Sequence, residues 1–285
     1  MSINRRELVC SLAAGSLLPA ALSAQPTQAP GGAALLDAYV RLSGSHDDRL
    51  VIWWMDGIRY GVVAAEAQAL FGMKVGMFHR FFRQTDGSFK IAFFELTYYT
   101  DLQTGKLLTT FDNPYTGETN KVRHVRLGPE VRRLTADGLS PPEGPGLSDL
   151  VKRYYSSLGP AVTRGGDIWI PTSVEALIRF PKPNAPDILL NLYTTVHGSI
   201  DAALDTLTAS ANCDLAFSNV LKWEPWMAMG DHAGHMMSKA EGRKLESVDA
   251  LPDDYLACAR AVHPRYIDDP PAALQRQVEK IKKPA

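Results

Sequence analysis

The sequence has little cysteine, no excess of either charge and no long apolar run after its first residues. Lys and Arg number 30 against 31 Asp and Glu, and the formal net charge is -1. Nucleic-acid and anionic-membrane binders usually carry a basic surface, so we expect neither kind of partner. No segment beyond the first 24 residues is long and apolar enough to span a bilayer, so we expect no integral membrane segment in the mature chain.

Familiar catalytic signatures are absent as well. The chain contains no Gly-x-Ser-x-Gly elbow, no phosphate-binding Gly-Lys loop, no dinucleotide glycine fingerprint after a strand and no His-Glu-x-x-His helix. These absences disfavour a standard serine hydrolase, a nucleotide-using enzyme and a zincin. We therefore expect no cofactor.

The first residues have the pattern of an export signal. Arg5 and Arg6 precede an apolar run from Leu8 to Leu22, and Ala24 closes a small-residue site of the kind that signal peptidase cuts. A paired arginine before a moderately apolar stretch is the twin-arginine pattern. The alternative, a buried N-terminal helix, is disfavoured because a glycine and a proline interrupt the run.

This signal sets the expected organisation of the chain. We expect residues 1–24 to be a removed twin-arginine signal peptide, residues 25–32 a linker and residues 33–285 a single β-rich domain in the periplasm. The twin-arginine translocase is the partner expected during export. Two cysteines then remain, Cys213 and Cys258. An oxidising compartment permits them to pair, and two free buried thiols fit the sequence equally well.

The clearest hairpin joins Met73–Gln84 to Phe89–Thr100. Both segments are rich in aromatic and branched residues, and Asp86-Gly87 between them is a type I′ turn signal. A two-residue turn pairs His79 with Phe94, whereas a three-residue loop with a bulge would shift that register. The two-residue turn gives one largely apolar face, composed of Val75, Met77, His79, Phe81, Ala92, Phe94, Leu96 and Tyr98.

Strand-like segments recur along most of the chain. Two further hairpins lead to Arg126, and later strands are predicted within Asp167–Pro181, Ile188–His197 and Leu215–Trp223. Helices are predicted over Ala33–Leu42, Leu147–Leu158, Ile200–Leu207 and Asp253–Val262. This pattern predicts a mainly β fold, an antiparallel β-barrel or strongly curved sheet of calycin or lipocalin-like form, with a few peripheral helices. Barrels of this kind commonly enclose one small ligand.

Three short motifs carry a family resemblance. They are Phe111–Glu118, which reads FDNPYTGE, the earlier Phe71-Gly72 and the later Trp223–Met227, which reads WEPWM. With them the chain resembles the bacterial and fungal family catalogued as domain of unknown function 1838, over almost the whole mature chain. The resemblance implies no particular activity, so it assigns no catalytic residues.

His79 is the first candidate for chemistry, because its neighbours on the predicted inward face are apolar. A neutral imidazole in an apolar cavity would suit a general base, with Tyr98 as a second polar contact on the same face. The simpler interpretation is a core histidine that hydrogen-bonds a neighbour. Glu118 and His124 form a second candidate pair, an acid and a base at a barrel mouth, although a structural Asn113–Gly117 turn explains most of that motif.

The segment Trp223–Met237 is unusual because two tryptophans, four methionines and two histidines lie close together. Thioether and imidazole ligands suit copper, with His232 and His235 as candidates, but no third ligand is identified. The alternative is that the methionines fill a core while Trp223 and Trp226 wall an apolar pocket.

Our preferred hypothesis is an exported barrel that holds a small apolar or aromatic molecule. It would be a cofactor-independent lyase, isomerase or hydrolase that uses His79 or His124 with a carboxylate such as Glu118. A non-catalytic binding or carrier protein and a periplasmic copper protein are the alternatives. The expected ligand-binding residues are Trp53, Phe81, Phe94, Tyr98, Asn113, Tyr115, Trp169, Trp223 and Trp226.

Overall fold

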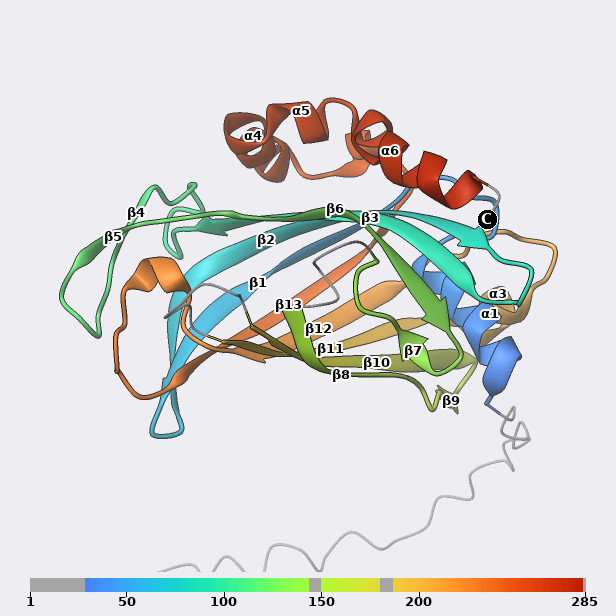
Figure 1. Ribbon diagram of the computed structural model, residues 1–285, viewed down its shortest axis with the longest axis horizontal. Coiled ribbons are helices and arrows are strands. Elements are labelled where there is room, and N and C mark those ends of the chain that lie inside the picture. Colours follow the sequence, from blue (N-terminus) through green and yellow to red (C-terminus); the bar gives the residue numbers. More distant parts are fainter. Residues whose placement is uncertain (1–28, 144–149, 180–186, 284–285) are drawn as a thin grey trace, which may run out of the picture.

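The computed structural model describes residues 29–143, 150–179 and 187–283. One antiparallel sheet has the strand order β7-β6-β3-β2-β1-β13-β12-β11-β10-β8, with β9 paired to β10. The sheet curls until β7 lies beside β8, which makes a nearly closed barrel (Figure 1). The predicted antiparallel barrel-like fold is confirmed. The strands of this sheet are β1 (Val51–Val63), β2 (Glu66–Arg83), β3 (Phe89–Thr100), β6 (Val125–Thr135), β7 (Gly138–Leu139), β8 (Val151–Leu158), β9 (Val162–Arg164), β10 (Asp167–Ile178), β11 (Ile188–Ser199), β12 (Asp214–Leu221) and β13 (His235–Leu245).

The β2–β3 hairpin turns through three residues, not two. Arg83 pairs with Phe89, and the amide of Gln84 donates to the carbonyl of Ser88 at 2.8 Å. Gly87 has φ +82, the left-handed conformation that such a loop requires at its last residue. The strand pairing predicted from a two-residue turn is therefore wrong by one residue. The structure has the shifted pairing that was expected for a three-residue loop with a bulge.

This shift reverses the two faces of β3. His79 pairs with Phe93, so Phe93 and Glu95 face the barrel interior together with it. Phe94 and Tyr98 face outward instead, where helices from the C-terminal segment cover them. The side-chain period of a strand is two, so a slip of one residue moves every side chain to the other face.

Three helices cover the outer face of β1, β2, β3 and β6: α4 (Asp253–Val262), α5 (Pro264–Ile267) and α6 (Pro270–Lys282) (Figure 1). β3 and the central part of β2 are buried on both sides, which explains their mainly apolar sequence. We call the apolar layer between helices and sheet the outer cluster. It comprises Ile52, Phe78, Phe82, Ala92, Phe94, Leu96, Tyr98, Leu251, Tyr255, Leu256, Cys258, Ala259, Tyr266, Ile267, Leu274 and Val278.

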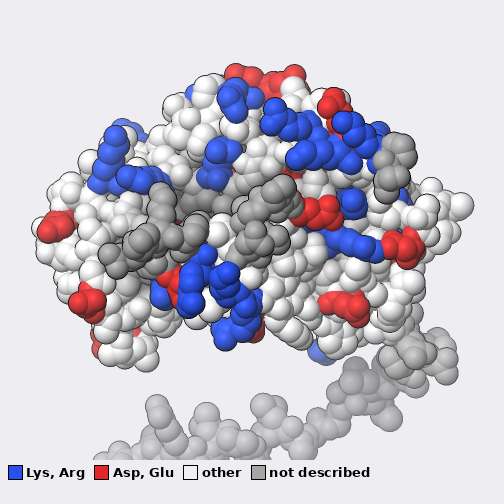
Figure 2. Space-filling view, viewed as in Figure 1, with Lys and Arg blue, Asp and Glu red and all other residues white. Residues whose placement is uncertain are grey.

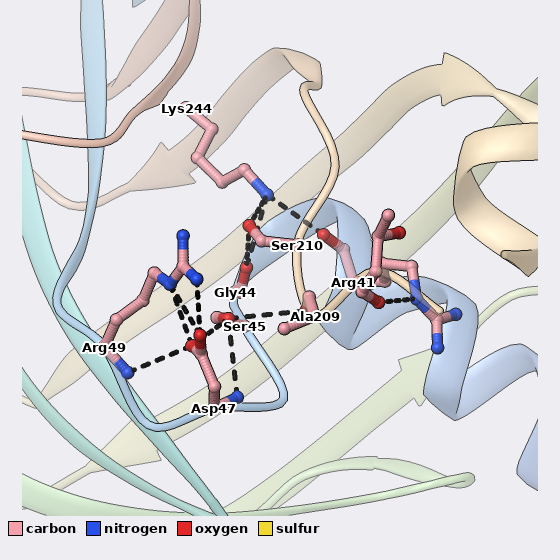
Figure 3. A network of polar contacts seen from close by, with 9 residues as sticks. Arg41, Gly44, Ser45, Asp47, Arg49, Ala209, Ser210 and Lys244 are labelled. Carbon is pink, nitrogen blue, oxygen red and sulfur yellow. Dashed lines mark hydrogen bonds and ion pairs between the residues drawn. The ribbon is translucent and has the colours of Figure 1, made fainter. Parts of the chain in front are cut away.

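The helices α1 (Gly32–Ser43) and α3 (Ile200–Leu204) lie at one end of the barrel. Lys244 fixes the end of α1, because its ammonium donates to the carbonyls of Arg41 and Gly44 and to the Ser210 hydroxyl (Figure 3). Burial lowers the pKa of Lys244 to about 8. Trp53 secures the same helix through a 2.6 Å bond from its indole nitrogen to the Ser43 carbonyl.

The helix predicted over Leu147–Leu158 is wrong where the structure describes it, because Val151–Leu158 is strand β8, paired with β10. Its aromatic residues Tyr154 and Tyr155 favour a strand, and pairing with β10 outweighs the helical pattern. The predicted helices at Ala33–Leu42 and Asp253–Val262 are present as α1 and α4. The predicted signal peptide and half of the predicted linker, residues 25–28, lie outside the described residues. No helix among the described residues is long and apolar enough to cross a membrane.

At the opposite end, strands β4 (Thr110–Asp112) and β5 (Thr119–Lys121) form a separate hairpin (Figure 1). The short helix η1 (Pro225–Met227) packs against β5, and η2 (Val248–Ala250) precedes α4. On the surface, Lys and Arg are interspersed with Asp and Glu over the face seen in Figure 2, as the net charge of -1 suggests.

Candidate functional site

A cavity of about 160 Å³ lies inside the barrel between β2, β3 and β6 on one side and β8, β10 and β11 on the other. Its wall is mainly apolar, with a few polar groups. Aromatic and aliphatic side chains contributed by facing strands include Trp53, Met77, Phe81, Ile91, Phe93, Leu127, Leu134, Val174, Leu192 and Phe217. The polar side chains include His79, Glu95, Arg132, Ser156, Thr172 and Thr194.

His79 lines this cavity and is 8% exposed. Its ring stacks on Phe93 at 5.1 Å and meets the edge of Trp53 at 5.4 Å. Its Nδ1 atom is buried without a hydrogen-bond partner among the described residues. Burial, helped by the charge of Arg132, lowers the pKa of His79 to about 3, so the imidazole is neutral at physiological pH.

Glu95 is the carboxylate that the sequence analysis missed. Glu95 lines the same cavity and pairs with Met77, so it is a diagonal neighbour of His79 across the β2–β3 ladder. The Thr97 hydroxyl donates a hydrogen bond to its Oε1 at 2.7 Å. Burial raises the pKa of Glu95, which favours the protonated carboxyl. The two-residue turn places Glu95 on the face opposite His79. The register of the three-residue loop, the alternative considered for this hairpin, would have placed Glu95 on the same face as His79.

Arg132 completes the polar part of the cavity wall. Its Nε donates to the carboxylate of Glu130, and its guanidinium lies 5.6 Å from the centre of the Phe93 ring. The charge on Arg132 is therefore paired before any ligand binds. The cavity thus offers a neutral imidazole and a protonatable carboxyl within an apolar wall, which suits hydrogen bonding to a small molecule with one or two polar atoms.

The predicted pair Glu118 and His124 is not brought together. His124 accepts a hydrogen bond from the backbone amide of Tyr99 at 3.2 Å and lies beside the Tyr98 ring. Glu118 is exposed in the β4–β5 hairpin, where its backbone carbonyl accepts from the Asn113 amide. No hydrogen bond or ion pair joins Glu118 to His124 in the described part of the chain.

The aromatic candidates fall into three places. Trp53 and Phe81 line the cavity. Phe94 and Tyr98 lie in the outer cluster, where the Tyr98 hydroxyl is 3.0 Å from Nδ1 of His263. Trp169 is not among the cavity residues; its ring stacks on His197 at 4.6 Å, while its neighbours Ile168 and Ile170 are buried in the inner core.

The remaining candidates gather at the end that carries β4 and β5. The Asn113 side chain donates to the Met227 carbonyl at 2.9 Å, which ties the hairpin to η1. Tyr115 packs against Trp223 at 5.1 Å, and Gly61 leaves room for its ring, because a Cβ there would overlap the Tyr115 hydroxyl.

Trp226 completes this end of the barrel by packing against Phe71 and Phe111. One of these partners lies in the Phe71-Gly72 motif and the other in the FDNPYTGE motif, while Trp226 itself belongs to WEPWM. The three motifs that carried the family resemblance therefore meet in space, although they are far apart in the sequence.

A second polar group lies beneath these motif residues and was not predicted. Arg59 of β1 is 4% exposed. Its Nη2 donates to the Tyr99 hydroxyl at 3.2 Å and forms a longer ion pair, at 3.7 Å, with Oε1 of Glu224. The Tyr99 hydroxyl in turn donates to Glu224 at 2.8 Å. We call Arg59, Tyr99 and Glu224, with the neighbouring Trp226 and Ser238, the arginine centre.

The methionines and histidines of the Trp223–Met237 segment lie in different environments and do not form one cluster. Met227, Met229 and Met236 are buried in the inner core, whereas His232 is exposed. His235 precedes Met236 on β13 and so faces the other side of the sheet. Among the described residues no group of three or more His, Cys, Asp or Glu side chains could hold a metal ion.

Cys213 and Cys258 are both buried, and both are free thiols. Burial raises the pKa of the Cys213 thiol to about 11. Cys213 lies in the inner core and Cys258 in the outer cluster, on opposite sides of the sheet.

Fold and interior together define an antiparallel barrel with an internal, mainly apolar cavity. The chain belongs to the family described as protein of unknown function (DUF1838), which matches residues 47–136 and 192–281. The two matched regions contribute neighbouring strands to one sheet, since β1 from the first pairs with β13 from the second. No curated protein matches the sequence.

Proposed function

We propose that this protein is an exported binding protein that holds a small, largely apolar or aromatic molecule in the cavity beside His79. The observation that carries this proposal is the cavity of about 160 Å³, whose wall is mainly apolar and contains a buried imidazole with an unpartnered nitrogen. An apolar cavity of about 150 Å³ in another protein takes up benzene, so this volume suits a single aromatic ring.

The lowered pKa of His79 favours binding over general-base catalysis. A group with a pKa of about 3 accepts a proton poorly from a substrate at neutral pH. The same neutral imidazole is a good hydrogen-bond partner for a ligand hydroxyl or carbonyl, because no charge has to be desolvated. His79 is therefore proposed to orient the ligand.

A cofactor-independent acid–base enzyme is the second candidate function. It is favoured by the position of the Glu95 carboxyl in the cavity wall. Its raised pKa allows the carboxyl to hold a proton in the cavity near His79 and to donate it to a bound molecule. A lyase, isomerase or hydrolase would then lose turnover in Glu95→Gln, while a binding protein would show no turnover to lose.

The binding proposal is tested with toluene and phenol as probes, by calorimetry and by thermal shift. Toluene reports the apolar volume, and phenol adds one hydroxyl that can pair with His79. We expect His79→Phe to weaken phenol binding about fivefold and toluene binding much less, because one hydrogen bond contributes about 1 kcal/mol. The matched control is His197→Phe, since His197 stacks on Trp169 and does not line the cavity.

Either of two results would contradict the proposal. Saturable binding of neither probe would mean that the cavity does not take up small aromatic molecules. Equal losses for toluene and phenol in His79→Phe would mean that the imidazole makes no polar contact with the ligand. Native mass spectrometry of protein purified from its own host would identify the natural occupant.

Export through the twin-arginine route is also part of the proposal. It is supported by Arg5 and Arg6 before the apolar run and by the small-residue site that ends at Ala24. This route carries proteins that have already folded, and the two described cysteines form no disulfide, so folding does not require an oxidising compartment.

A further inference from the structure

The arginine centre contains more buried hydrogen-bond donors than acceptors. The Nε and Nη1 atoms of Arg59, the indole nitrogen of Trp226 and the hydroxyl of Ser238 have no partner among the described residues. Each of these atoms is buried, and Arg59 is more than nine-tenths buried as a residue. A buried donor without a partner costs free energy, and a buried charge costs more, so such groups normally face an acceptor.

The sheet register places these groups beside one another. Arg59 pairs with Ser238, Ser238 with Asn219 and Asn219 with Leu192, so the four side chains form one row across neighbouring strands. Directly paired residues share a face of the sheet. Trp226 lies near this row, because its ring is 6.0 Å from that of Tyr99, the residue that Arg59 contacts.

The internal acceptors are too few for these donors. Glu224 lies 3.7 Å from Arg59, longer than a direct hydrogen bond, and its closer bond is the 2.8 Å contact with Tyr99. The Asn219 Oδ1 atom is a further acceptor in the row and is itself unpartnered in the described chain. A guanidinium with free N–H groups, next to an indole N–H and a hydroxyl, matches the oxygens of a carboxylate.

The arginine centre and the cavity lie along the same inner face of the barrel wall. The inward positions of β3 run from Glu95, which lines the cavity, through Thr97 to Tyr99, which contacts Arg59. Leu192, at the far end of the Arg59 row, also lines the cavity. A molecule whose ring occupies the cavity therefore has the arginine centre on the side toward η1.

We infer that Arg59, Trp226 and Ser238 form a carboxylate-binding site, so that the ligand is a small aromatic or aliphatic acid rather than a hydrocarbon or alcohol. This inference rests on the proposed function for the apolar part of the ligand. The carboxylate would receive hydrogen bonds from the free guanidinium nitrogens of Arg59 and from the Trp226 indole. The ring would remain in the cavity beside His79.

The test compares two probes of nearly the same shape, 3-phenylpropanoate and propylbenzene, by calorimetry. Trp226→Phe keeps an aromatic ring and removes the indole N–H, so we expect about tenfold weaker binding of 3-phenylpropanoate and little change for propylbenzene. Arg59→Lys should show a loss at least as large, because it removes the planar set of donors. The matched control is Trp223→Phe, whose indole donates to the His232 carbonyl outside this site.

The outcomes separate the inference from the proposed function. Suppose propylbenzene binds, but neither Trp226→Phe nor Arg59→Lys weakens the binding of 3-phenylpropanoate more than that of propylbenzene. The free donors then pair internally with Asn219 and Ser238, and the inference is overturned. If 3-phenylpropanoate alone binds, and depends on Trp226 and Arg59, the carboxylate site stands while the hydrocarbon-binding cavity does not. If neither probe binds, both are wrong. Circular dichroism of each variant checks that it has folded, and Trp226→Phe remains informative if Arg59→Lys does not fold.

Discussion

His79, Glu95 and Lys244 are ionisable side chains that the barrel removes from water. In each case burial disfavours the charged form: the pKa of His79 falls to about 3, that of Lys244 falls to about 8 and that of Glu95 rises. Lys244 compensates with three hydrogen bonds to groups around the end of α1. His79 has no such set of partners, so its burial reduces stability in acid.

At the residue scale we predict a loss of stability in acid that depends on His79. Its pKa is about 3 in the folded state against 6.5 as the ordinary value, so between these pH values the unfolded chain binds more protons. The free energy of unfolding should therefore fall as the pH drops below 6.5, by at most about 1.4 kcal/mol per pH unit, until about pH 3. Urea denaturation of the wild-type protein and of His79→Gln at pH 7, 6, 5 and 4 measures this difference.

The variant should lose less stability than the wild type over this range. His235→Gln serves as the control, because His235 lies on the side of β13 that faces away from the inner core. Parallel curves for wild type and His79→Gln would show that His79 is not buried as a neutral group.

At the element scale, the C-terminal helices depend on close contact with the outer face of the sheet. Tyr255 of α4 is fully buried and donates from its hydroxyl to the Leu96 carbonyl at 3.3 Å. Its ring lies over Gly76 of β2, where a Cβ atom would overlap the Tyr255 hydroxyl. The glycine therefore allows α4 to approach the strand.

We predict that Gly76→Ala displaces α4 and lowers the free energy of unfolding by about 1–3 kcal/mol, the usual cost of overpacking. Amide hydrogens of α4 should exchange faster, which mass spectrometry detects. The control is a double-mutant cycle with Tyr255→Ala, which removes the overlapping ring. The two substitutions should be strongly non-additive; simple additivity would mean that the helix does not rest on Gly76.

At the scale of the whole molecule, the barrel forms without a disulfide between the described cysteines. Cys213 and Cys258 are buried on opposite sides of the sheet, and stability comes from the inner and outer apolar layers. Folding therefore does not depend on that disulfide, which is compatible with the proposed export of the folded chain.

We predict that replacing both Arg5 and Arg6 by Lys keeps the precursor in the cytoplasm, with at least a tenfold drop in periplasmic protein by fractionation and immunoblot. The retained protein should be folded, with protected amides in β1–β3. Arg260→Lys is the control, because Arg260 is an exposed residue of α4 and is distant from Arg5 and Arg6 in the sequence. Undiminished export of the double variant would exclude the twin-arginine route.

The sequence by itself determined the class of fold. Alternating apolar and polar residues, frequent turn signals and few helical segments predict an antiparallel barrel, because strand periodicity is a local property of the chain. The inward position of His79 could also be predicted, since Val75, Met77 and Phe81 on the same parity of β2 are apolar. Trp53 and Phe81 were likewise placed in the interior, and both line the cavity.

Only the tertiary structure decided which residues of other strands meet His79. The turn at Gly87 takes one more residue than the dipeptide signal suggests, and this brings Phe93 and Glu95 inward in place of Phe94 and Tyr98. Register depends on turn geometry and on burial of both faces, and here both faces of β3 are apolar, so the pattern could not choose between them. The arginine centre was hidden for a similar reason: Arg59 and Glu224 are 165 residues apart in sequence. They become neighbours because β13 pairs with β1 on one side and with β12, which Glu224 follows, on the other.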